Sequence, residues 1–145
     1  MSKAKTIHLY TDGGARGNPG PAGIGGILRD PENGTIIESF AQVIGERTNN
    51  QAEYEALLEG LRRANHFGAQ VVECFLDSQL VVEQLSRRYR VKDQSLAQLF
   101  VKVWNQTLDF QKVAFHAIPR EQNRAADRLV NLALDRAASG QGGLP

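Results

Sequence analysis

The chain has 145 residues, the size of one domain with room for a hydrophobic core, and 41% of the residues are hydrophobic. Its 17 Lys and Arg and 16 Asp and Glu residues give a formal net charge of +1. The molecule as a whole therefore creates no field that would concentrate a polyanion, and binding of nucleic acid would need a local patch or site.

Cysteine content and apolar runs restrict the protein class. A single cysteine, Cys74, excludes an intramolecular disulfide framework, and its setting VVECFLD predicts a core position. No spacing of Cys and His suggests a zinc site. The N-terminal MSKAKTIHLY lacks the apolar stretch of a signal peptide, and no run of about 18 uncharged apolar residues occurs. We therefore expect a cytoplasmic protein without a membrane span.

The first half of the chain predicts three antiparallel strands and a helix. KTIHLYTD alternates between two faces, which predicts a strand that ends at Asp12. AGIGGILRD and GTIIESFAQVIG predict two more strands, joined by the turn-forming PENG. From Thr48 to Phe67 the apolar period is helical, TNNQ forms a capping box at the start, and Gly68 is the expected stop.

The second half predicts two strands and three helices. AQVVECFLD is a continuous apolar run, which is typical of a strand buried on both faces. Helices are expected over Gln79 to about Ser86, Gln94 to about Leu108 and Asn123 to about Ala138, and QKVAFHAI predicts a fifth strand before Pro119. The order βββαβααβα implies one mixed sheet covered by helices, which is a single α/β domain.

Four acidic residues stand at ends of predicted strands or in first turns of predicted helices: Asp12, Glu53, Asp77 and Asp127. Glu53 shares a helix face with Leu57, so its carboxylate should point toward the sheet and needs a partner or a bound ion. Asp77 closes a buried run and has the same need. If the first and fourth strands are neighbours, all four acids can converge at one rim of the sheet.

Carboxylates at one rim repel each other, at a cost of about 3 kcal/mol for a pair ~5 Å apart at an effective dielectric of about 20. Divalent cations offset this repulsion, and oxygen ligands without His or Cys favour Mg²⁺ or Mn²⁺ over zinc. Two such ions can clamp the attacking and leaving oxygens of a phosphoryl displacement, so the pattern indicates phosphodiester hydrolysis.

Structural roles are alternatives for three of these acids. Asp12 is compatible with a turn, Asp77 with a helix N-cap, and Asp127 with a first-turn acid favoured by the helix dipole. Glu53 fits a structural role worst.

Four segments together resemble type 1 ribonuclease H, which cuts the RNA strand of RNA–DNA hybrids: YTDGGARGNPGPAGIGGIL, TNNQAEYEALLEGL, FLDSQLVVEQL and NRAADRLVNLAL. The resemblance runs from about Thr6 to Arg136, with all four motifs in order. It implies a ribonuclease H-like domain, a five-stranded mixed sheet flanked by helices, over residues 1–138. Residues 139–145 are expected to form a disordered tail.

The resemblance also implies roles for individual residues. The metal-binding and catalytic carboxylates would be Asp12, Glu53, Asp77 and Asp127, with Glu53 also near the RNA 2′-hydroxyl. Two Mg²⁺ ions per site are implied, with Mn²⁺ as the alternative, and the products would carry 5′-phosphate and 3′-hydroxyl ends. Residues implied to contact the hybrid are Gly13, Gly14, Asn18, Thr48, Asn49, Asn50 and Gln79.

The chemistry of these side chains is consistent with such contacts. Amides both donate and accept, so Asn49, Asn50 and Gln79 can meet base edges and 2′-hydroxyls in a wide minor groove. Thr48 matches a contact to a DNA phosphate. Glycines after Asp12 would let the backbone turn sharply and approach a sugar-phosphate chain. A monomer is expected.

The chain departs from the family pattern in the loop before the last helix. Many members have a histidine there, whereas Pro119 to Asn123 reads PREQN. The sequence leaves open whether Arg120 or Glu121 substitutes for it or whether turnover needs no such residue. His116 lies in a predicted strand, where a packed or surface role is expected.

A second departure is the absence of a long basic, tryptophan-rich insertion. In its place stands RRYRVK, from Arg87 to Lys92, which is either a weak phosphate-contacting patch or a solvated helix end. Trp104 is expected in the core.

Two other functions compete with a hybrid nuclease. A catalytically silent hybrid-binding module is disfavoured because binding alone gives no reason to keep four repelling carboxylates. Exonucleases, resolvases and transposases share related sheets and acid clusters, and the segment TNNQAE argues against them. The sequence therefore predicts a Mg²⁺-dependent endoribonuclease acting on RNA–DNA hybrids.

Overall fold

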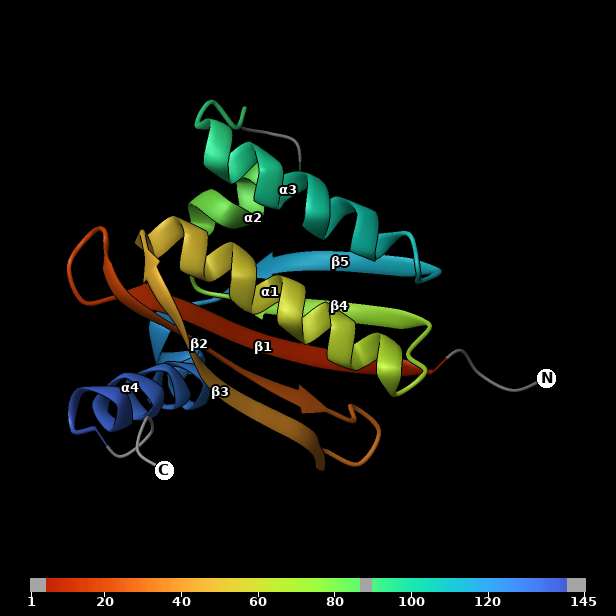
Figure 1. The fold of residues 1–145 in the computed structure, drawn as a ribbon. Coiled ribbons are helices and arrows are strands. Elements are labelled where there is room, and N and C mark those ends of the chain that lie inside the picture. Colours follow the sequence, from red (N-terminus) through yellow and green to blue (C-terminus); the bar gives the residue numbers. More distant parts are fainter. Residues whose placement is uncertain (1–4, 87–89, 141–145) are drawn as a thin grey trace.

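A five-stranded mixed sheet forms the centre of the fold (Figure 1). The computed structural model describes residues 5–86 and 90–140. The strands are β1 (Thr6–Ala15), β2 (Gly20–Arg29), β3 (Ile36–Arg47), β4 (Val71–Leu76) and β5 (Lys112–Ala117), in the spatial order β3-β2-β1-β4-β5. β1 pairs antiparallel with β2 and parallel with β4. The first and fourth strands are thus neighbours, and the predicted mixed α/β domain is confirmed.

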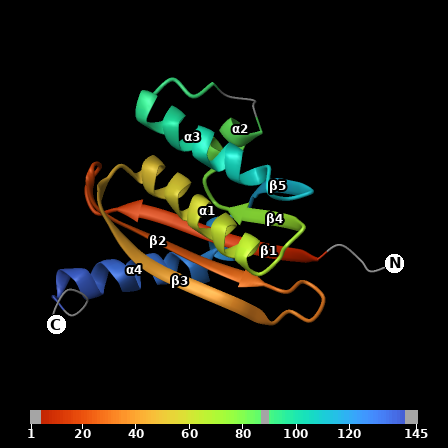
Figure 2. The ribbon, with the colours of Figure 1, turned by 45° about the vertical axis from the view of Figure 1, so that its right-hand side comes forward.

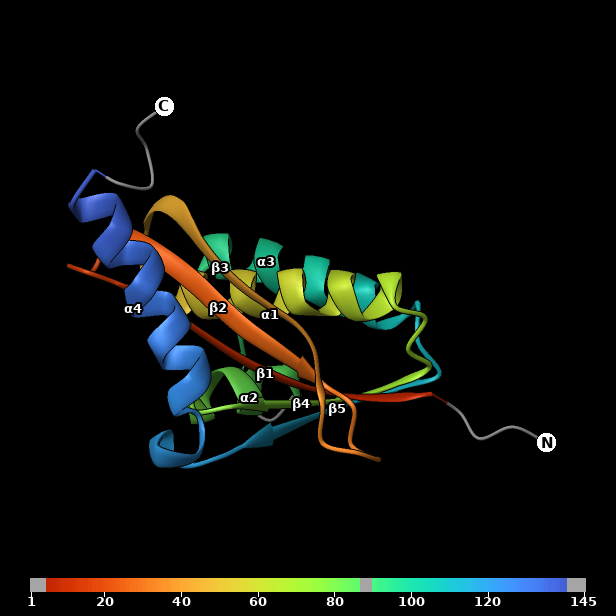
Figure 3. The same ribbon diagram turned by 90° about the horizontal axis from the view of Figure 1, so that it is seen from below.

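Helices cover both faces of the sheet. The helices are α1 (Asn49–His66), α2 (Gln79–Leu85), α3 (Gln94–Thr107) and α4 (Arg124–Ala138), and a 3₁₀ turn, η1 (Arg120–Gln122), precedes α4. α1 lies on one face with α3 packed against it (Figure 2), and α4 crosses the opposite face (Figure 3). Of the helices in the described part of the chain, none has the length and apolarity needed to cross a membrane.

The ends of α1 follow from local sequence. The Thr48 hydroxyl accepts a hydrogen bond from the Gln51 backbone N–H (3.1 Å), and Gln51 Oε1 accepts one from the Thr48 backbone N–H (2.9 Å). This is the predicted capping box. Beyond the C-cap residue Phe67, Gly68 has a φ of +77°, a left-handed conformation that glycine adopts without a steric cost.

The core lies between α1 and the sheet. Its fully buried side chains come from neighbouring strands and from the sheet-facing side of α1, and they include Ile7, Leu9, Leu57, Leu61, Val72 and Cys74. The predicted core position of Cys74 is confirmed. Trp104, expected in the core, is half-buried on α3 and stacks on Phe100 with ring centroids 6.4 Å apart.

The prediction that β4 is buried on both faces is wrong. Burial alternates along the strand, with Val72 and Cys74 buried and Glu73 and Phe75 only partly so. The reason is that α4 packs mainly on β1, β2 and β3, and none of the described helices packs extensively on that face of β4. The Phe75 ring is instead flanked by other rings of the sheet, stacking on Tyr10 (4.9 Å) and His116 (5.1 Å).

The prediction that β1 ends at Asp12 is also wrong. Pairing with β4 ends at Tyr10, but pairing with β2 continues to Ala15, so Gly13 and Gly14 lie in the strand. Gly17, with a φ of +96°, lies in the bend between β1 and β2. A Cβ at Gly13 would lie 2.3 Å from the carbonyl oxygen of Ala52 in α1. Gly13 therefore allows the first turns of α1 to approach β1 closely.

Gly13→Ala is expected to lower the free energy of unfolding by about 1–3 kcal/mol, because the added methyl group must push α1 away from β1. Chemical denaturation measures this change. Gly14→Ala is the matched control, since the nearest atoms to a Cβ there are 3.9 Å away, and a change below about 0.5 kcal/mol is expected. Equal losses in the two variants would contradict the close-approach explanation.

Candidate active site

Four acidic side chains from four different segments line one pocket of about 300 Å³. Asp12 comes from β1, Glu53 from α1, Asp77 from the residue after β4, and Asp127 from the first turn of α4. The pocket lies where β1 and β4 stop pairing, since β1 has only β2 as a neighbour beyond Tyr10. The structure thus brings together all four acids that the sequence singled out.

Local structure excludes the structural alternatives considered for Asp12 and Asp77, whereas Asp127 does lie in the first turn of α4. The N-cap of α2 is Ser78, whose side chain accepts a hydrogen bond from the Val81 N–H (3.3 Å), so Asp77 is not the cap. Asp12 lies within a paired strand and not in a turn. Glu53 is held near Asp12 because Gly13 admits the backbone of α1 at Ala52 and Glu53.

Burial and mutual repulsion raise the proton affinity of two of the acids. The pKa of Asp12 rises from 3.8 to about 8, first because of burial, then because of the Asp77 charge and a hydrogen bond with Asp127. The pKa of Glu53 rises from 4.5 to about 7, again mainly through burial, although a hydrogen bond with Ser78 and the Arg120 charge act in the opposite direction. At neutral pH the pocket therefore retains protons unless positive charge enters it.

The donor set fits a hard divalent cation. Glu53 Oε2 is buried and has no hydrogen-bond partner among the described residues, and the acids offer only oxygen ligands. No three His, Cys, Asp or Glu side chains within residues 5–86 and 90–140 are already arranged to hold a metal ion. Asp127 and Asp77 both contribute to the raised pKa of Asp12, so a bound cation would replace interactions among the acids themselves.

A buried amide, Asn123, connects the segments that carry three of the acids. Its side chain is 2% exposed, and Nδ2 donates to the Thr11 carbonyl (2.9 Å) and to Asp77 Oδ2 (3.4 Å). Its own carbonyl accepts the first backbone hydrogen bond of α4, from Asp127 (3.1 Å). Asn123 is the N-cap of α4 yet makes no side-chain capping bond, because the amide is directed to β1. Sequence reasoning placed it only at a helix start.

Several residues expected to contact substrate also have partners within the protein. The Asn49 side chain accepts from the Ala15 N–H (2.8 Å), and the Asn18 side chain accepts from the Asn49 N–H (3.0 Å). Together with the Thr48 cap, these bonds tie the loop between β1 and β2 to the start of α1. Gly13, Gly14 and Asn49 line the acidic pocket.

The other expected substrate contacts lie around the pocket without lining it. Asn18 and Gln79 are exposed, and Thr48 and Asn50 are half-buried. Asn50 and Gln79 make no side-chain hydrogen bond to another described residue. These two amides are therefore available to a ligand.

The loop before α4 contributes an arginine to the pocket. Arg120 lines it, whereas Glu121 lines only a neighbouring groove. His116 does not line the pocket: its side chain is 45% exposed and pairs with Glu73 (2.9 Å). Of the basic segment from Arg87 to Lys92, the first three residues lie outside the described residues, and Arg90 and Lys92 are exposed.

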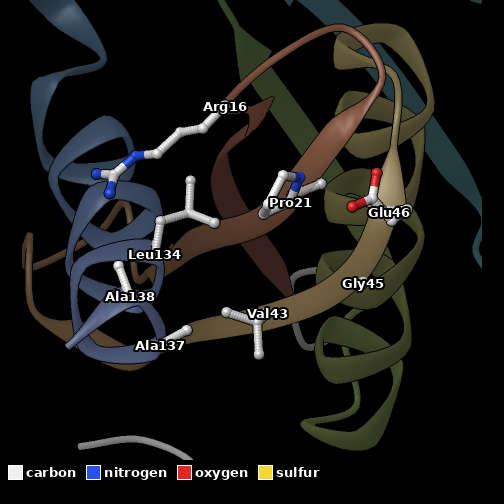
Figure 4. A pocket seen from close by; sticks show the side chains of 9 residues that line it. Arg16, Pro21, Val43, Gly45, Glu46, Leu134, Ala137 and Ala138 are labelled. Atoms are coloured by element: carbon white, nitrogen blue, oxygen red, sulfur yellow. The ribbon is translucent and has the colours of Figure 1, made fainter. Parts of the chain in front are cut away.

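A mainly apolar cavity of about 380 Å³ lies beside the acidic pocket, between the end of α4 and β2 and β3 (Figure 4). Its lining includes Pro21, Val43 and Ala137, and it shares Arg16 and Leu134 with the acidic pocket. Its two charged side chains, Arg16 and Glu46, do not form a cluster of like charges. We therefore place the chemistry in the acidic pocket.

The sequence of this chain is similar to a known protein family and to several known proteins. A family model described as "Reverse transcriptase-like" matches residues 10–133. The chain is 43% identical over 132 residues to the bifunctional protein Rv2228c of Mycobacterium tuberculosis, covering 91% of this chain and 36% of that protein. It therefore spans about a third of the length of these mycobacterial relatives.

Two solved structures are matched over nearly their whole length. One is RNase H1 from the archaeon Halobacterium salinarum, with a TM-score of 0.87 and 40% identity, covering 90% of this chain and 98% of that chain. The other is LC11-RNase H1, isolated from compost and solved in complex with an RNA/DNA hybrid. In that complex the TM-score is 0.86 and the identity 44%, covering 91% of this chain and 99% of that chain.

Without divalent cations, the free energy of unfolding is expected to fall as the pH rises from about 4 to about 8. Asp12 and Glu53 have raised pKa values in the folded state, about 8 and about 7, so they stabilise the protein fully below their ordinary values of 3.8 and 4.5. This contribution is lost as the pH rises through the folded-state values. Urea denaturation in chelator at a series of pH values measures it.

The control for this pH dependence is Asp12→Asn. It should flatten the decline and raise the free energy of unfolding at pH 8 by about 0.5–2 kcal/mol. The contrary result is a free energy of unfolding that rises with pH in the metal-free wild type and is the same in the variant. It would show that the four acids do not repel one another.

Asn123→Ala is expected to lower the free energy of unfolding by about 1–3 kcal/mol, because it leaves the buried Thr11 carbonyl without its donor. Thermal or chemical denaturation checks this value. Asn105→Ala removes an exposed amide from α3 and should change stability by less than about 0.5 kcal/mol. A similarly small change in the free energy of unfolding at both positions would show that the Asn123 side chain does not stabilise the site.

Proposed function

Because the chain belongs to the ribonuclease H family, we propose that it is an endoribonuclease that hydrolyses the RNA strand of RNA–DNA hybrids. The observation that supports this activity most directly is the pocket shared by Asp12, Glu53, Asp77 and Asp127. Its carboxylates gain proton affinity from burial and from one another, which is the electrostatic state that a cation would relieve.

The four carboxylates are the proposed metal ligands and catalytic groups. A pair of Mg²⁺ ions, or Mn²⁺ in their place, would supply an acidified attacking water and a counter-charge for the leaving 3′-oxygen, which gives 5′-phosphate and 3′-hydroxyl ends. Glu53 is proposed in addition to accept a hydrogen bond from the 2′-hydroxyl next to the cleaved bond.

Recognition of the hybrid is assigned to the start of α1, the start of α2 and the loop between β1 and β2. Asn50 and Gln79 have amides that are not used within the described structure, so they can meet base edges and the 2′-hydroxyl in the minor groove. Asn49 and Asn18 are already held by backbone groups, which orients them before substrate binds. Thr48 combines its capping role with the proposed contact to a DNA phosphate.

Two further features of the proposal concern assembly and the missing histidine. All four acids come from one chain, so we infer that the enzyme acts as a monomer. Arg120 is the residue of the loop before α4 that lines the pocket, and its positive charge favours the ionised form of Glu53. It is the candidate to stabilise negative charge where other family members have a histidine.

Asp77→Asn is expected to reduce hybrid cleavage at saturating substrate by at least about 100-fold, since a carboxylate in a preorganised site has an effect of this size. Hybrid binding measured in Ca²⁺ should stay within about threefold of wild type. Labelled RNA–DNA hybrid, double-stranded RNA and double-stranded DNA, each with Mg²⁺, Mn²⁺ or chelator, complete the assay. Only the hybrid should be cut, and only with a divalent cation.

The control for the lost charge is Glu32→Gln, an exposed acid in the turn between β2 and β3, which should leave cleavage unchanged. Full activity in Asp77→Asn would refute its role as a metal ligand. Equal cleavage of double-stranded RNA by the wild type would refute the substrate assignment.

A further inference from the structure

A groove of about 600 Å³ along the start of α4 is lined by three arginines, Arg120, Arg124 and Arg128. Its other lining residues are Glu121, Asp127 and Asn131. Arg120, Asp127 and Asn131 also line the acidic pocket, so the groove is a direct continuation of that pocket. A chain-like ligand that binds the acidic pocket with one group would therefore place the adjacent part of its chain in the groove.

The guanidinium groups of Arg124 and Arg128 are available for binding. Both residues are exposed, and neither side chain forms an ion pair or hydrogen bond with another described residue. Some other arginines are engaged, for example Arg16 with Asp135 (2.6 Å) and Arg47 with Glu55 (2.7 Å). Arg62 and Arg136 are exposed without such a partner among the described residues, but neither lines a groove next to the acids.

The placement of these two arginines is unfavourable for the helix itself. Arg124 is the first residue of α4 and Arg128 follows four residues later, so their like charges lie on one helix face and repel. Cations near a helix N-terminus are also disfavoured by the helix dipole. The repulsion and the unfavourable dipole interaction both destabilise α4, and no ion pair within the described residues offsets them. Such locally unfavourable residues are expected where their charges bind a ligand.

The charge of the groove indicates the chemical class of that ligand. Three guanidinium groups, Arg120, Arg124 and Arg128, line the groove together with two carboxylates, Glu121 and Asp127, which leaves the groove with one excess positive charge. Guanidinium groups bind phosphate through two parallel hydrogen bonds, and a strand of nucleic acid presents one phosphate after another. The acidic pocket and the cationic groove together match a cleaved phosphodiester and its neighbours along the strand.

We propose that Arg124 and Arg128 bind the phosphates of the RNA strand adjacent to the one that is cleaved, with Arg120 between them and the acids. The identity of the strand rests on the function proposed above. The groove is then a second nucleic-acid contact, separate from the amides of α1 and α2, and it provides the local basic patch that the net charge does not.

The test is the salt dependence of hybrid binding. The double variant Arg124→Gln/Arg128→Gln keeps the aliphatic stems and removes both charges. Fluorescence anisotropy of a labelled RNA–DNA hybrid in Ca²⁺, over a series of salt concentrations, gives Kd and its salt slope. The slope should become shallower by about 1.4–1.8, since each phosphate contact contributes about 0.7–0.9, and Kd at low salt should rise at least tenfold.

The matched control is Arg62→Gln/Arg136→Gln, which removes the same charge from two exposed arginines outside both pockets. Its slope should stay near that of wild type and its Kd within about twofold. An unchanged slope in Arg124→Gln/Arg128→Gln, or the same change in both double variants, would overturn the proposal.

A modified substrate locates the contact. Neutral methylphosphonate linkages next to the cleavage position should weaken wild-type binding and leave the Arg124→Gln/Arg128→Gln variant almost unaffected, whereas equal weakening of both proteins would also overturn the proposal. Binding in Ca²⁺ requires no cleavage. A wild type that binds the hybrid with the expected slope and fails to cut it in Mg²⁺ would therefore contradict the proposed function and leave the phosphate site intact.

Discussion

Four carboxylates share one partly desolvated pocket, and their mutual repulsion is the constraint that the surrounding structure has to balance. Burial alone raises the proton affinity of Asp12 and Glu53, and the neighbouring acids add to it. A fold that only needed stability would place apolar side chains there. The divalent cations proposed as ligands of this pocket would offset that repulsion, so the same ions would stabilise the fold and take part in the proposed chemistry.

The elements meet at this pocket through contacts that allow little movement. Gly13 lets α1 approach β1 closely enough to place Glu53 beside Asp12. Beyond the last paired residues of β1 and β4, the Asn123 side chain donates hydrogen bonds to the Thr11 carbonyl and to Asp77. The backbone carbonyl of Asn123 accepts the first hydrogen bond of α4. Two small residues thus connect the four segments, and neither of them carries a charge.

The distribution of charge around the pocket suits a chain of phosphates. Acids are concentrated in the pocket, while arginines without an ion pair to a described residue follow along the start of α4. The amides of α1 and α2 lie at other elements, so in the proposed complex different parts of the fold would position the strand and recognise the 2′-hydroxyl. Such a division would allow a chain with a net charge of +1 to bind a polyanion.

The sequence by itself determined the order of strands and helices, the capping box at Thr48 and the four acids, because periodicity and capping act over a few residues. It did not determine that β1 continues past Asp12, that Gly13 serves helix packing, or that β4 has one open face. Nor did it assign the Asn123 amide to β1 or align Arg124 and Arg128 with the acids. Tertiary structure decided these features, because each depends on which segments, distant along the chain, come within a few ångströms of each other.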